Sequence, residues 1–473
     1  MRQLVGISVL MLAISAAPLN RAEDPYLEEG TEDNYYEEPT HEHYYEEPTE
    51  DSYYEEWIEQ PLDHFNRSIL DTLSQRYFER LSDSWNDSGH YVVLVLGGEW
   101  EIASKDHDDT DNNVEPLNAS IFVLEHRYYG QSLPNFDIDT PAAMQFLSMS
   151  QAVEDIRFFI KSMDEMHQFN EPRWILVGCS YAGILATWAR ALISDLTIAT
   201  HASSAPVNSK IDGHQEVLVD LFSNNSADCI GAAIQVFHPE KSETFSECCK
   251  STMRGENISF CDDGQVNYFW HISRTVQYSE SDETVSEICS DLKTLAKSMK
   301  NNENNITDAI VTEQEVNELM EKYVQETSET SDDEQSTDYQ FDYQLCNELG
   351  LFPVAGVIAP QMSNSTILDA CRQDFEMDED TVRKRPKNMA VRYEEEIFPK
   401  LTNVIFTNGW RDTWRKQGEY REDKSRNIRS VLVRDAAHCQ DITDPFNSEL
   451  AKVVEEVNSF LMNAKPIKTN VVL

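Results

Sequence analysis

One serine of this chain lies in a setting that suits a nucleophile. Ser180 is part of the hexapeptide Gly178–Gly183 (GCSYAG), which follows the apolar run Trp174–Val177 and precedes a run with helical spacing. A nucleophilic serine needs a sharp strand-to-helix turn that exposes its hydroxyl, and small residues flank it because the turn is cramped. Ala182 stands where the usual Gly-x-Ser-x-Gly pattern has its second glycine, and a glycine follows one residue later. The context indicates acyl-transfer chemistry; a glycine- and serine-rich turn that binds nothing is the alternative.

The acid and the base that such a serine needs should follow it along the chain. Hydrolases with this type of turn place an aspartate and then a histidine after the serine. Asp412 follows the apolar run Val404–Phe406, and His438 follows Val431–Val433. Both positions come just past expected strand ends, where open α/β sheets place their active sites. Ser180, Asp412 and His438 are therefore the predicted catalytic residues.

The negative charge that develops on an attacked carbonyl also needs hydrogen-bond donors. Gly97, Gly98 and Glu99 follow the apolar run Tyr91–Leu96, and glycines there would let a backbone N–H turn toward the oxyanion. The N–H of Tyr181, next to the serine, would be a second donor. We therefore expect Tyr181, Gly98 and Glu99 to form the oxyanion hole, with an ordinary turn as the alternative interpretation of the two glycines.

The segments around these residues alternate between strand and helix patterns. Short, unbroken, β-rich runs suit a parallel sheet that is covered on both faces. Such runs occur at Tyr91–Leu96, Ile121–Leu124, Trp174–Val177, Val404–Phe406 and Val431–Val433. Apolar residues with helical spacing occur at Met149–Ile160, Ile184–Ile193 and Leu450–Leu461. The alternation predicts an α/β fold and, with the serine motif, an α/β hydrolase.

Residues 209–342 interrupt this alternation. They are polar, hold five of the nine cysteines, and contain helical patches such as Val316–Val324. Their last part, Glu326–Asp342, is acidic and has no basic residue. We predict a mostly helical cap domain at 209–342 with an exposed acidic linker at its end. The hydrolase domain would then comprise 57–208 and 343–473.

Two further segments precede the globular part. Residues 1–22 contain Arg2, an apolar run and then small residues, which is the layout of a secretory signal peptide. Residues 23–56 hold 15 Asp and Glu, no Lys or Arg, and three copies of Tyr-Tyr-Glu-Glu. Such a segment has too little apolar surface to offset its ordering entropy, so we predict a disordered acidic tail.

The composition excludes several classes of protein. The 473 residues carry a formal charge of 38 − 85 = −47, with a pI near 4.4. A chain this acidic does not suit non-specific binding to nucleic acid or to anionic membranes. After the signal peptide no segment has 18 uninterrupted apolar residues, so no membrane span is expected.

The sequons and the cysteines agree with the secretory pathway. Seven Asn-x-Ser/Thr sequons are candidates for glycosylation: Asn66, Asn86, Asn118, Asn224, Asn257, Asn305 and Asn364. Nine cysteines form an odd set, so at least one is free or pairs between chains. None has the spacing of zinc ligands, and we expect neither a metal nor a cofactor. A secreted or lysosomal protein is predicted, and a homodimer is left open.

An ordered set of motifs is similar to the prolyl carboxypeptidase-like serine peptidases, and the thymus-specific branch is most similar. The matching stretches run in family order from about residue 57 to 441. They are Gln60–Phe65, Gln75–Phe78, Gly97–Glu99, Glu125–Gly130 with Ser132 and Pro134, Ser150–Ala152, Gly178–Gly183, Ala202–Pro206, Tyr343–Cys346, Asn408 and Gly409 with Asp412 and Trp414, and His438 with Cys439.

This resemblance implies a fold and an activity. The fold would be an α/β hydrolase with a helical domain that is inserted after the nucleophile and caps the active site. The substrates would be small peptides cut beside proline, by a carboxypeptidase or a dipeptidyl peptidase. The resemblance also implies a disulfide between Cys346 and Cys371.

The chain departs from the family pattern near the predicted site. Cys179 replaces a glycine before the serine, Trp100 replaces the last glycine of Gly-Gly-Glu-Gly, and Thr413 replaces a proline. Arg411 and Trp410 add bulk beside the predicted aspartate. These changes leave the triad complete but put the substrate preference in question.

Cys179 and Cys439 each neighbour a predicted catalytic residue. Two small buried thiols are the favoured interpretation, and a disulfide would require their Cα atoms to lie within about 7 Å.

Other interpretations stay open. Asp435 and Asp441 compete with Asp412 for the role of the acid. A serine carboxypeptidase of another family also uses a Gly-x-Ser-Tyr-Ala-Gly turn, and a lipase or esterase shares the fold and the triad. From a different class, a secreted binding protein or pseudoenzyme could use the acidic tail as its functional part.

Overall fold

The computed structural model describes most of the globular part of the chain. It covers residues 53–102, 115–209, 215–237, 264–279, 281–303, 338–351, 358–359, 364–434, 436–444 and 450–465. The predicted signal peptide (1–22), the first thirty residues of the predicted tail (23–52) and the helical patch expected at Val316–Val324 lie outside the described residues.

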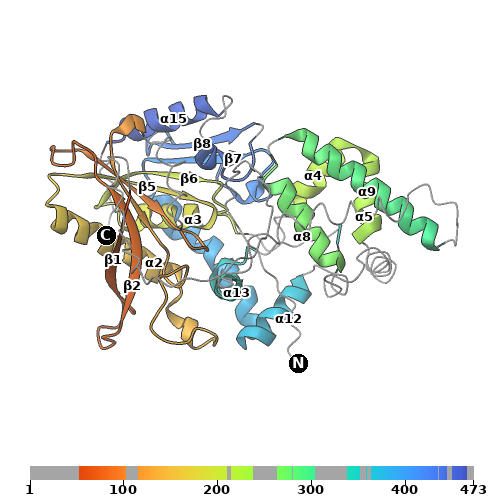
Figure 1. Cartoon of the computed structure of the whole chain (residues 1–473), viewed down its shortest axis with the longest axis horizontal. Helices are drawn as coiled ribbons and strands as arrows, with labels where there is room; N and C mark the ends of the chain where they lie inside the picture. Colours follow the sequence, from red (N-terminus) through yellow and green to blue (C-terminus); the bar gives the residue numbers. More distant parts are fainter. Residues whose placement is uncertain are drawn as a thin grey trace, which may run out of the picture.

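One eight-stranded sheet forms the centre of the fold (Figure 1). Its strands are β1 (Tyr54–Pro61), β2 (Thr72–Arg80), β3 (Tyr91–Leu96), β4 (Ser120–Leu124), β5 (Arg173–Cys179), β6 (Thr197–Ser203), β7 (Val404–Gly409) and β8 (Ile428–Val433). Their spatial order is β1-β2-β4-β3-β5-β6-β7-β8. All pairs from β4 to β8 are parallel, whereas β1 and β2 form an antiparallel edge. The predicted α/β-hydrolase fold is confirmed.

Helices cover the sheet and continue into the insert. The helices that follow strands of the hydrolase domain are α2 (Met149–His167), α3 (Ser180–Leu192), α14 (Gln440–Thr443) and α15 (Ala451–Met462). Those between β6 and β7 are α4 (Gln215–Asn225), α5 (Ala227–Phe237), α8 (Gly264–Gln277), α9 (Asp282–Glu303), α11 (Asp338–Gln344), α12 (Asn364–Phe375) and α13 (Glu379–Arg392). Short π and 3-10 segments lie at Leu345–Leu349, Tyr393–Ile397, Phe398–Lys400, Glu115–Leu117, Ala143–Phe146 and Arg415–Gln417.

Alternate residues of the central strands pack on opposite faces of the sheet. Val92 and Leu94 of β3 share a hydrophobic cluster with Ile156 of α2, whereas Val93 shares one with Phe460 of α15. Because side chains alternate along a strand, a strand that is covered on both sides must be apolar at every position. This is why the unbroken apolar runs of the sequence marked the central strands correctly.

Three strands of the sheet were not predicted from the sequence, and the predicted end of the acidic tail is wrong. β1, β2 and β6 lack a continuous apolar run, and β6 buries the polar His201 and Ser203 instead. The disordered tail was predicted to reach residue 56, but β1 begins at Tyr54 and pairs with β2. Backbone hydrogen bonds to a neighbouring strand thus order the last acidic residues, although their side chains are mostly exposed.

The helices α4, α5, α8 and α9 pack around a hydrophobic core of their own. Figure 1 shows these four helices to the right of the sheet, on the side where β7 is labelled. A disulfide joins Cys229 of α5 to Cys289 of α9, with the Cα atoms 5.0 Å apart. The acidic linker predicted to end at Asp342 is corrected here, because α11 begins at Asp338 and Phe341 is buried in the main core.

A buried ion cluster ties the N-terminal hairpin to α2. The Arg127 guanidinium donates to both oxygens of Asp155 at 2.5 and 2.6 Å, and His64 Nε2 lies 2.7 Å from the same carboxylate. Arg127 also donates to the carbonyl of Leu62. Burial alone would raise the pKa of Asp155, but the charge of Arg127 and these hydrogen bonds hold it below its usual range. Residues of two family-like motifs therefore serve to pack the fold.

A second buried carboxylate organises the turn after β4. Glu125 accepts hydrogen bonds from Arg76 at 2.7 Å and from the Ser132 hydroxyl at 2.6 Å. A Cβ atom on Gly130 would lie 2.1 Å from Oε1 of Glu125, and the φ of Gly130 is +53°. Only glycine fits there, so the end of the EHRYYG stretch is fixed by this carboxylate.

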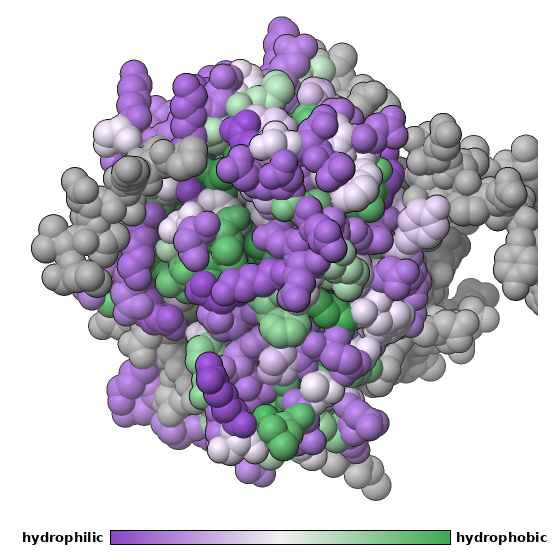
Figure 2. Space-filling view, turned by 90° about the vertical axis from the view of Figure 1, so that its left-hand side faces the viewer, coloured by the Kyte–Doolittle hydropathy of each residue, from purple (hydrophilic) through white to green (hydrophobic). Residues whose placement is uncertain are grey.

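Figure 2 shows the face on the side of β1 and β2 as mainly hydrophilic, with hydrophobic residues in small separate groups, as on ordinary protein surfaces. Among the described residues no helix is both long enough and apolar enough to cross a membrane.

The ion cluster yields a stability prediction. Asp155→Asn leaves the Arg127 charge buried without its counter-charge, so we expect a loss of roughly 3–5 kcal/mol in the free energy of unfolding. Asp369→Asn is the control, because Asp369 pairs with Arg372 at 2.7 Å while both side chains are more than half exposed. That change should cost less than about 1 kcal/mol. Denaturant unfolding measures both, and equal losses would contradict the prediction.

Candidate active site

The predicted nucleophile sits in a strained turn between β5 and α3. Ser180 has a φ of +55°, a left-handed value that a non-glycine residue adopts only when its surroundings impose it. A Cβ atom on Gly178 would lie 2.3 Å from the carbonyl oxygen of Ala182, and one on Gly183 would lie 2.9 Å from Cβ of Ala205. The segment after β6 approaches the turn most closely at Gly183. This contact gives a reason why the second glycine of the motif stands at 183 and not at 182.

The predicted acid and base lie side by side at the ends of β7 and β8. Nδ1 of His438 is 2.8 Å from Oδ1 of Asp412, and both side chains are fully buried. The backbone N–H of Trp414 donates to the same Oδ1 at 2.8 Å. Within the described part of the chain, neither ring nitrogen of His438 makes a well-aligned hydrogen bond, so the link to Asp412 is the close approach of Nδ1 to the carboxylate. A histidine with a buried carboxylate beside Nδ1 and no hydrogen-bond partner at Nε2 has the arrangement of a general base.

A disulfide joins the turn that holds Ser180 (the serine turn, 178–183) to the loop that holds His438 (the histidine loop, 436–439). Cys179 precedes Ser180, Cys439 follows His438, and their Cα atoms are 5.8 Å apart across 260 residues of sequence. A ring nitrogen of His438 lies within 4.8 Å of both sulfur atoms. The interpretation of two separate thiols is therefore wrong. The spacing of the cysteines gave no sign of the pairing, because only the sheet brings the two loops together.

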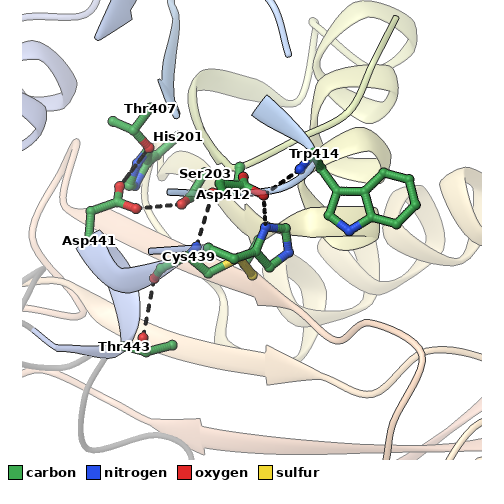
Figure 3. Close-up of a disulfide and its surroundings, with 11 residues drawn as sticks. His201, Ser203, Thr407, Asp412, Trp414, Cys439, Asp441 and Thr443 are labelled. Carbon is green, nitrogen blue, oxygen red and sulfur yellow. Dashed lines mark hydrogen bonds and ion pairs between the residues drawn. A yellow bond between two sulfur atoms is a disulfide. The ribbon is translucent and has the colours of Figure 1, made fainter. Parts of the chain in front are cut away.

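A buried polar cluster anchors the other side of the histidine loop (Figure 3). Asp441 accepts hydrogen bonds from the hydroxyls of Ser203 and Thr407, both at 2.6 Å, and lies 3.1 Å from Nε2 of His201. Burial favours the neutral acid, but these partners hold the pKa of Asp441 below its usual range. The loop is thus tied to the ends of both β6 and β7.

The contacts of this cluster distinguish Asp441 from Asp412 as the candidate acid. Both oxygens of Asp441 are engaged by residues of the sheet, and Asp412 is the carboxylate beside His438. Asp435, the other alternative, lies outside the described residues. The backbone N–H of Cys439 donates to the Ser204 hydroxyl at 3.0 Å, which adds a further tie to the segment after β6.

The predicted oxyanion residues lie in a crowded, buried region. A Cβ atom on Gly98 would lie 2.5 Å from the ring of Trp100, so the tryptophan that departs from the family pattern packs directly on this glycine. Glu99 is buried, and within the described residues neither of its carboxylate oxygens has a hydrogen-bond partner. Burial raises the pKa of Glu99 from 4.5 to about 8. The oxyanion role of Gly98, Glu99 and Tyr181 stays a prediction.

The side chain of Tyr181 joins a buried network that includes a residue of α11. Its hydroxyl donates to or accepts from Nε2 of His126 at 2.9 Å and accepts from the Gln344 amide at 2.8 Å. Tyr129 donates to the same amide of Gln344 at 2.5 Å. Burial lowers the pKa of His126 to about 4, so this imidazole is neutral at physiological pH. The network fixes Tyr181 next to the serine.

Residues of the insert also reach the site, and the sequence analysis missed them. The backbone carbonyl of Gln277, at the end of α8, accepts the N–H of His438 at 2.9 Å. The ring of Tyr278 lies edge-on to the His438 ring, with the centroids 5.9 Å apart. No local pattern could reveal these contacts, because a polar residue at the end of a helix is common.

Two further predictions concern a disulfide and metal binding. A third disulfide joins Cys346 to Cys371, the pair that the family resemblance implies. In the described residues the one group with metal-like proximity is Cys179, His438 and Cys439, and its two sulfur atoms are bonded to each other. They therefore offer no thiolate to a metal ion.

Four of the predicted glycosylation sites are exposed, namely Asn66, Asn86, Asn118 and Asn224. Asn257 and Asn305 lie outside the described residues, as does the side chain of Asn364. Glycosylation at these sites stays a prediction.

The chain is similar over most of its length to a family of serine peptidases and to several proteins. Residues 60–458 match the family model described as serine carboxypeptidase S28. The chain is 26% identical to the mouse thymus-specific serine protease over 432 residues, which cover 82% of each chain. It is 24% identical to the human lysosomal Pro-X carboxypeptidase over 440 residues, covering 84% of this chain and 86% of the relative. The crystal structure of a proline iminopeptidase from Mycobacterium smegmatis superimposes with a TM-score of 0.40 at 10% identity, over 86% of this chain and 99% of that one.

The disulfide beside the site predicts a selective effect. Replacing Cys179 and Cys439 by alanine frees the histidine loop from the serine turn, whereas replacing Cys229 and Cys289 leaves both in place. Each pair should cost roughly 2–4 kcal/mol of stability. Only the first pair should slow the reaction of Ser180 with a fluorophosphonate probe, measured at a temperature where both variants are folded. Equal labelling rates in the two variants would speak against a positioning role for the Cys179–Cys439 bond.

The buried acid predicts a pH dependence of stability. Between pH of about 4.5 and about 8 the folded chain holds a proton on Glu99 that the unfolded chain has lost. The unfolded state then binds fewer protons, so this group lowers stability as the pH rises through that window. Glu99→Gln should remove this fall, which is measured as the melting temperature at pH 5 and pH 8. The exposed Glu165→Gln should keep the wild-type dependence, and a Glu99→Gln profile parallel to the wild type would refute the assignment.

Proposed function

Because this chain belongs to the serine carboxypeptidase S28 family, we propose that it is an exopeptidase that trims small peptides beside proline. Membership of the family makes the chain a serine-type peptidase. The proline preference is supported by a relative that is named as a Pro-X carboxypeptidase. The proposal includes both a carboxypeptidase and a dipeptidyl peptidase, since either would act at a chain end beneath the helical insert.

The proposed reaction proceeds through an acyl-enzyme. The Ser180 hydroxyl oxygen attacks the carbonyl carbon of the peptide bond while Nε2 of His438 takes its proton. The C–N bond then breaks, and the imidazolium returns the proton to the leaving amine. Water attacks the resulting ester in the second half, again with the histidine as base, and regenerates the serine. Asp412 orients the imidazole and stabilises its cation.

The observation that carries this proposal is the buried pair of His438 and Asp412, 2.8 Å apart, joined by a disulfide to the serine turn. Water is excluded from this pair, so the carboxylate acts on the imidazole in a medium of low dielectric constant. The left-handed φ of Ser180 is the further support, because strained backbone of this kind holds a nucleophile at the mouth of such a turn.

The same proposal includes a location. The signal-like N-terminus, the exposed sequons and the three disulfides among the described residues support a secreted or lysosomal enzyme. Oxidising compartments preserve disulfides, and the reducing cytosol does not. The substrates would then be peptides of the lysosome or of the extracellular fluid.

The nucleophile is tested by Ser180→Ala. This variant should lose hydrolysis of prolyl peptides and labelling by a fluorophosphonate, because the attacking oxygen is absent while the fold is retained. Ser459→Ala, which changes an exposed serine of α15 outside any sequon, should behave like the wild type. Near-wild-type hydrolysis by Ser180→Ala would refute the assignment.

The specificity is tested by digesting a mixed peptide library and reading the products by mass spectrometry. We expect single residues or dipeptides to be released from one end, next to proline. Release from the C-terminus would identify a carboxypeptidase, and release of dipeptides from the N-terminus a dipeptidyl peptidase. Cleavage in the interior of long peptides, or no effect of proline, would refute the proposal.

A further inference from the structure

The last residue of α8 contacts both loops that hold the proposed acid and base. The backbone carbonyl of Gln277 accepts a hydrogen bond from the backbone N–H of His438 at 2.9 Å. Its side-chain oxygen accepts the hydroxyl of Thr413 at 3.0 Å and the indole N–H of Trp414 at 3.1 Å. Thr413 and Trp414 directly follow Asp412, and Trp414 donates its own backbone N–H to that carboxylate. One residue of the insert therefore holds both sides of the acid–base pair.

The next residues extend this contact. The backbone carbonyl of Ser279 accepts Nε of Arg411 at 2.7 Å, and the Arg411 guanidinium lies 3.7 Å from Asp282 at the start of α9. Arg411, which directly precedes the proposed catalytic acid, is 1% exposed. Residues 277–279 together with 281 and 282, which we call the α8–α9 turn, thus contact three residues of the loop around Asp412 (the acid loop, 410–414) and one residue of the histidine loop.

Burial makes these contacts specific. Gln277, Thr413, Trp414 and His438 are each at most 6% exposed. Water has little access to the donors of Thr413 and Trp414, so removing the Gln277 oxygen would cost each of these buried groups a hydrogen bond that water cannot replace. The acceptor therefore selects one position of the α8–α9 turn relative to the acid loop.

The turn belongs to a unit with its own packing. The helices α8 and α9 share a hydrophobic core with α4 and α5, and the Cys229–Cys289 disulfide closes this core. A displacement of these helices would therefore carry Gln277 with it. The insert is in this way mechanically connected to the proposed acid and base, and does more than cover them.

We propose that Gln277 is a positioning residue, which sets the geometry of Asp412 and His438 only while the helical insert is seated on the hydrolase domain. The inference rests on the proposed triad of Ser180, Asp412 and His438. It implies that peptides too large to fit under the seated insert would meet a misaligned acid–base pair, so that access and activity are controlled by the same contact.

Two substitutions separate positioning from simple packing. Gln277→Leu has a similar size but removes the acceptor, so the acid loop loses two hydrogen bonds. Gln277→Glu keeps an acceptor at the same place and adds a negative charge near Asp412. That charge favours the protonated imidazole, and activity should therefore rise at a higher pH than in the wild type. The charged and titratable groups around this pair are Glu99, Arg274, Tyr278, Asp282, Arg411, Arg415 and Tyr420.

The experiment measures the rate at which Ser180 of the full-length protein reacts with a fluorophosphonate, together with kcat and KM on a peptide from the library. Gln277→Leu should react about 10–100-fold more slowly and lose kcat to a similar extent, with KM changed less than about threefold. Gln277→Glu should keep much of the rate at high pH but show a pH profile shifted upward. Gln235→Leu is the matched control, because Gln235 bonds the Ala296 carbonyl of α9 within the insert, at 2.9 Å. It should label and turn over like the wild type.

The outcomes are distinct. Wild-type labelling by a folded Gln277→Leu overturns the proposal, as does a loss of activity that merely follows the melting temperature without a pH shift in Gln277→Glu. A wild type that labels at Ser180 but cuts no prolyl peptide refutes the substrate proposal alone, since labelling still tests Gln277. A wild type that fails to label at Ser180 counts against the triad and, with it, against this inference.

Discussion

The bond between Cys179 and Cys439 is the constraint on which the site depends. It joins two loops that are 260 residues apart in the sequence, one with the strained serine and one with the buried histidine. Neither loop is fixed by its own sequence, because each is only a short connection after a strand. The Asp441 cluster and the Ser204 hydroxyl hold the same histidine loop from the other side. Covalent and polar ties together leave this loop little freedom.

Other family-like motifs form buried ion clusters elsewhere in the hydrolase domain. The Arg127–Asp155 cluster packs the N-terminal hairpin on α2, and Glu125 shapes the turn after β4. These are buried charges with satisfied partners, which contribute a defined geometry at a high desolvation cost. Some motif residues therefore pack the fold and others form the proposed site. Whether a residue is an acid or a base does not show which of the two roles it has.

The helical insert is hydrogen-bonded to the acid loop, on both sides of Asp412. Its core is separate from that of the hydrolase domain, yet its α8–α9 turn bonds to residues on both sides of Asp412. A cap that shares hydrogen bonds with the proposed catalytic loops differs from a cap that only limits access. Under the proposal made above, the same few contacts would limit the size of the substrate and align the acid–base pair.

The sequence by itself determined the central strands, the order of serine, aspartate and histidine, and the family. Strands covered on both faces must be apolar at every position, so Tyr91–Leu96 could be found locally. The tertiary structure alone decided the polar strand β6, the Cys179–Cys439 bond, the burial of Glu99 without a hydrogen-bond partner among the described residues, and the contacts of Gln277. Each of these depends on which distant residue lies opposite, as His201 finds Asp441 and Gln277 finds Thr413. Such pairings follow from the order of strands in the sheet, which no local spacing of residues encodes.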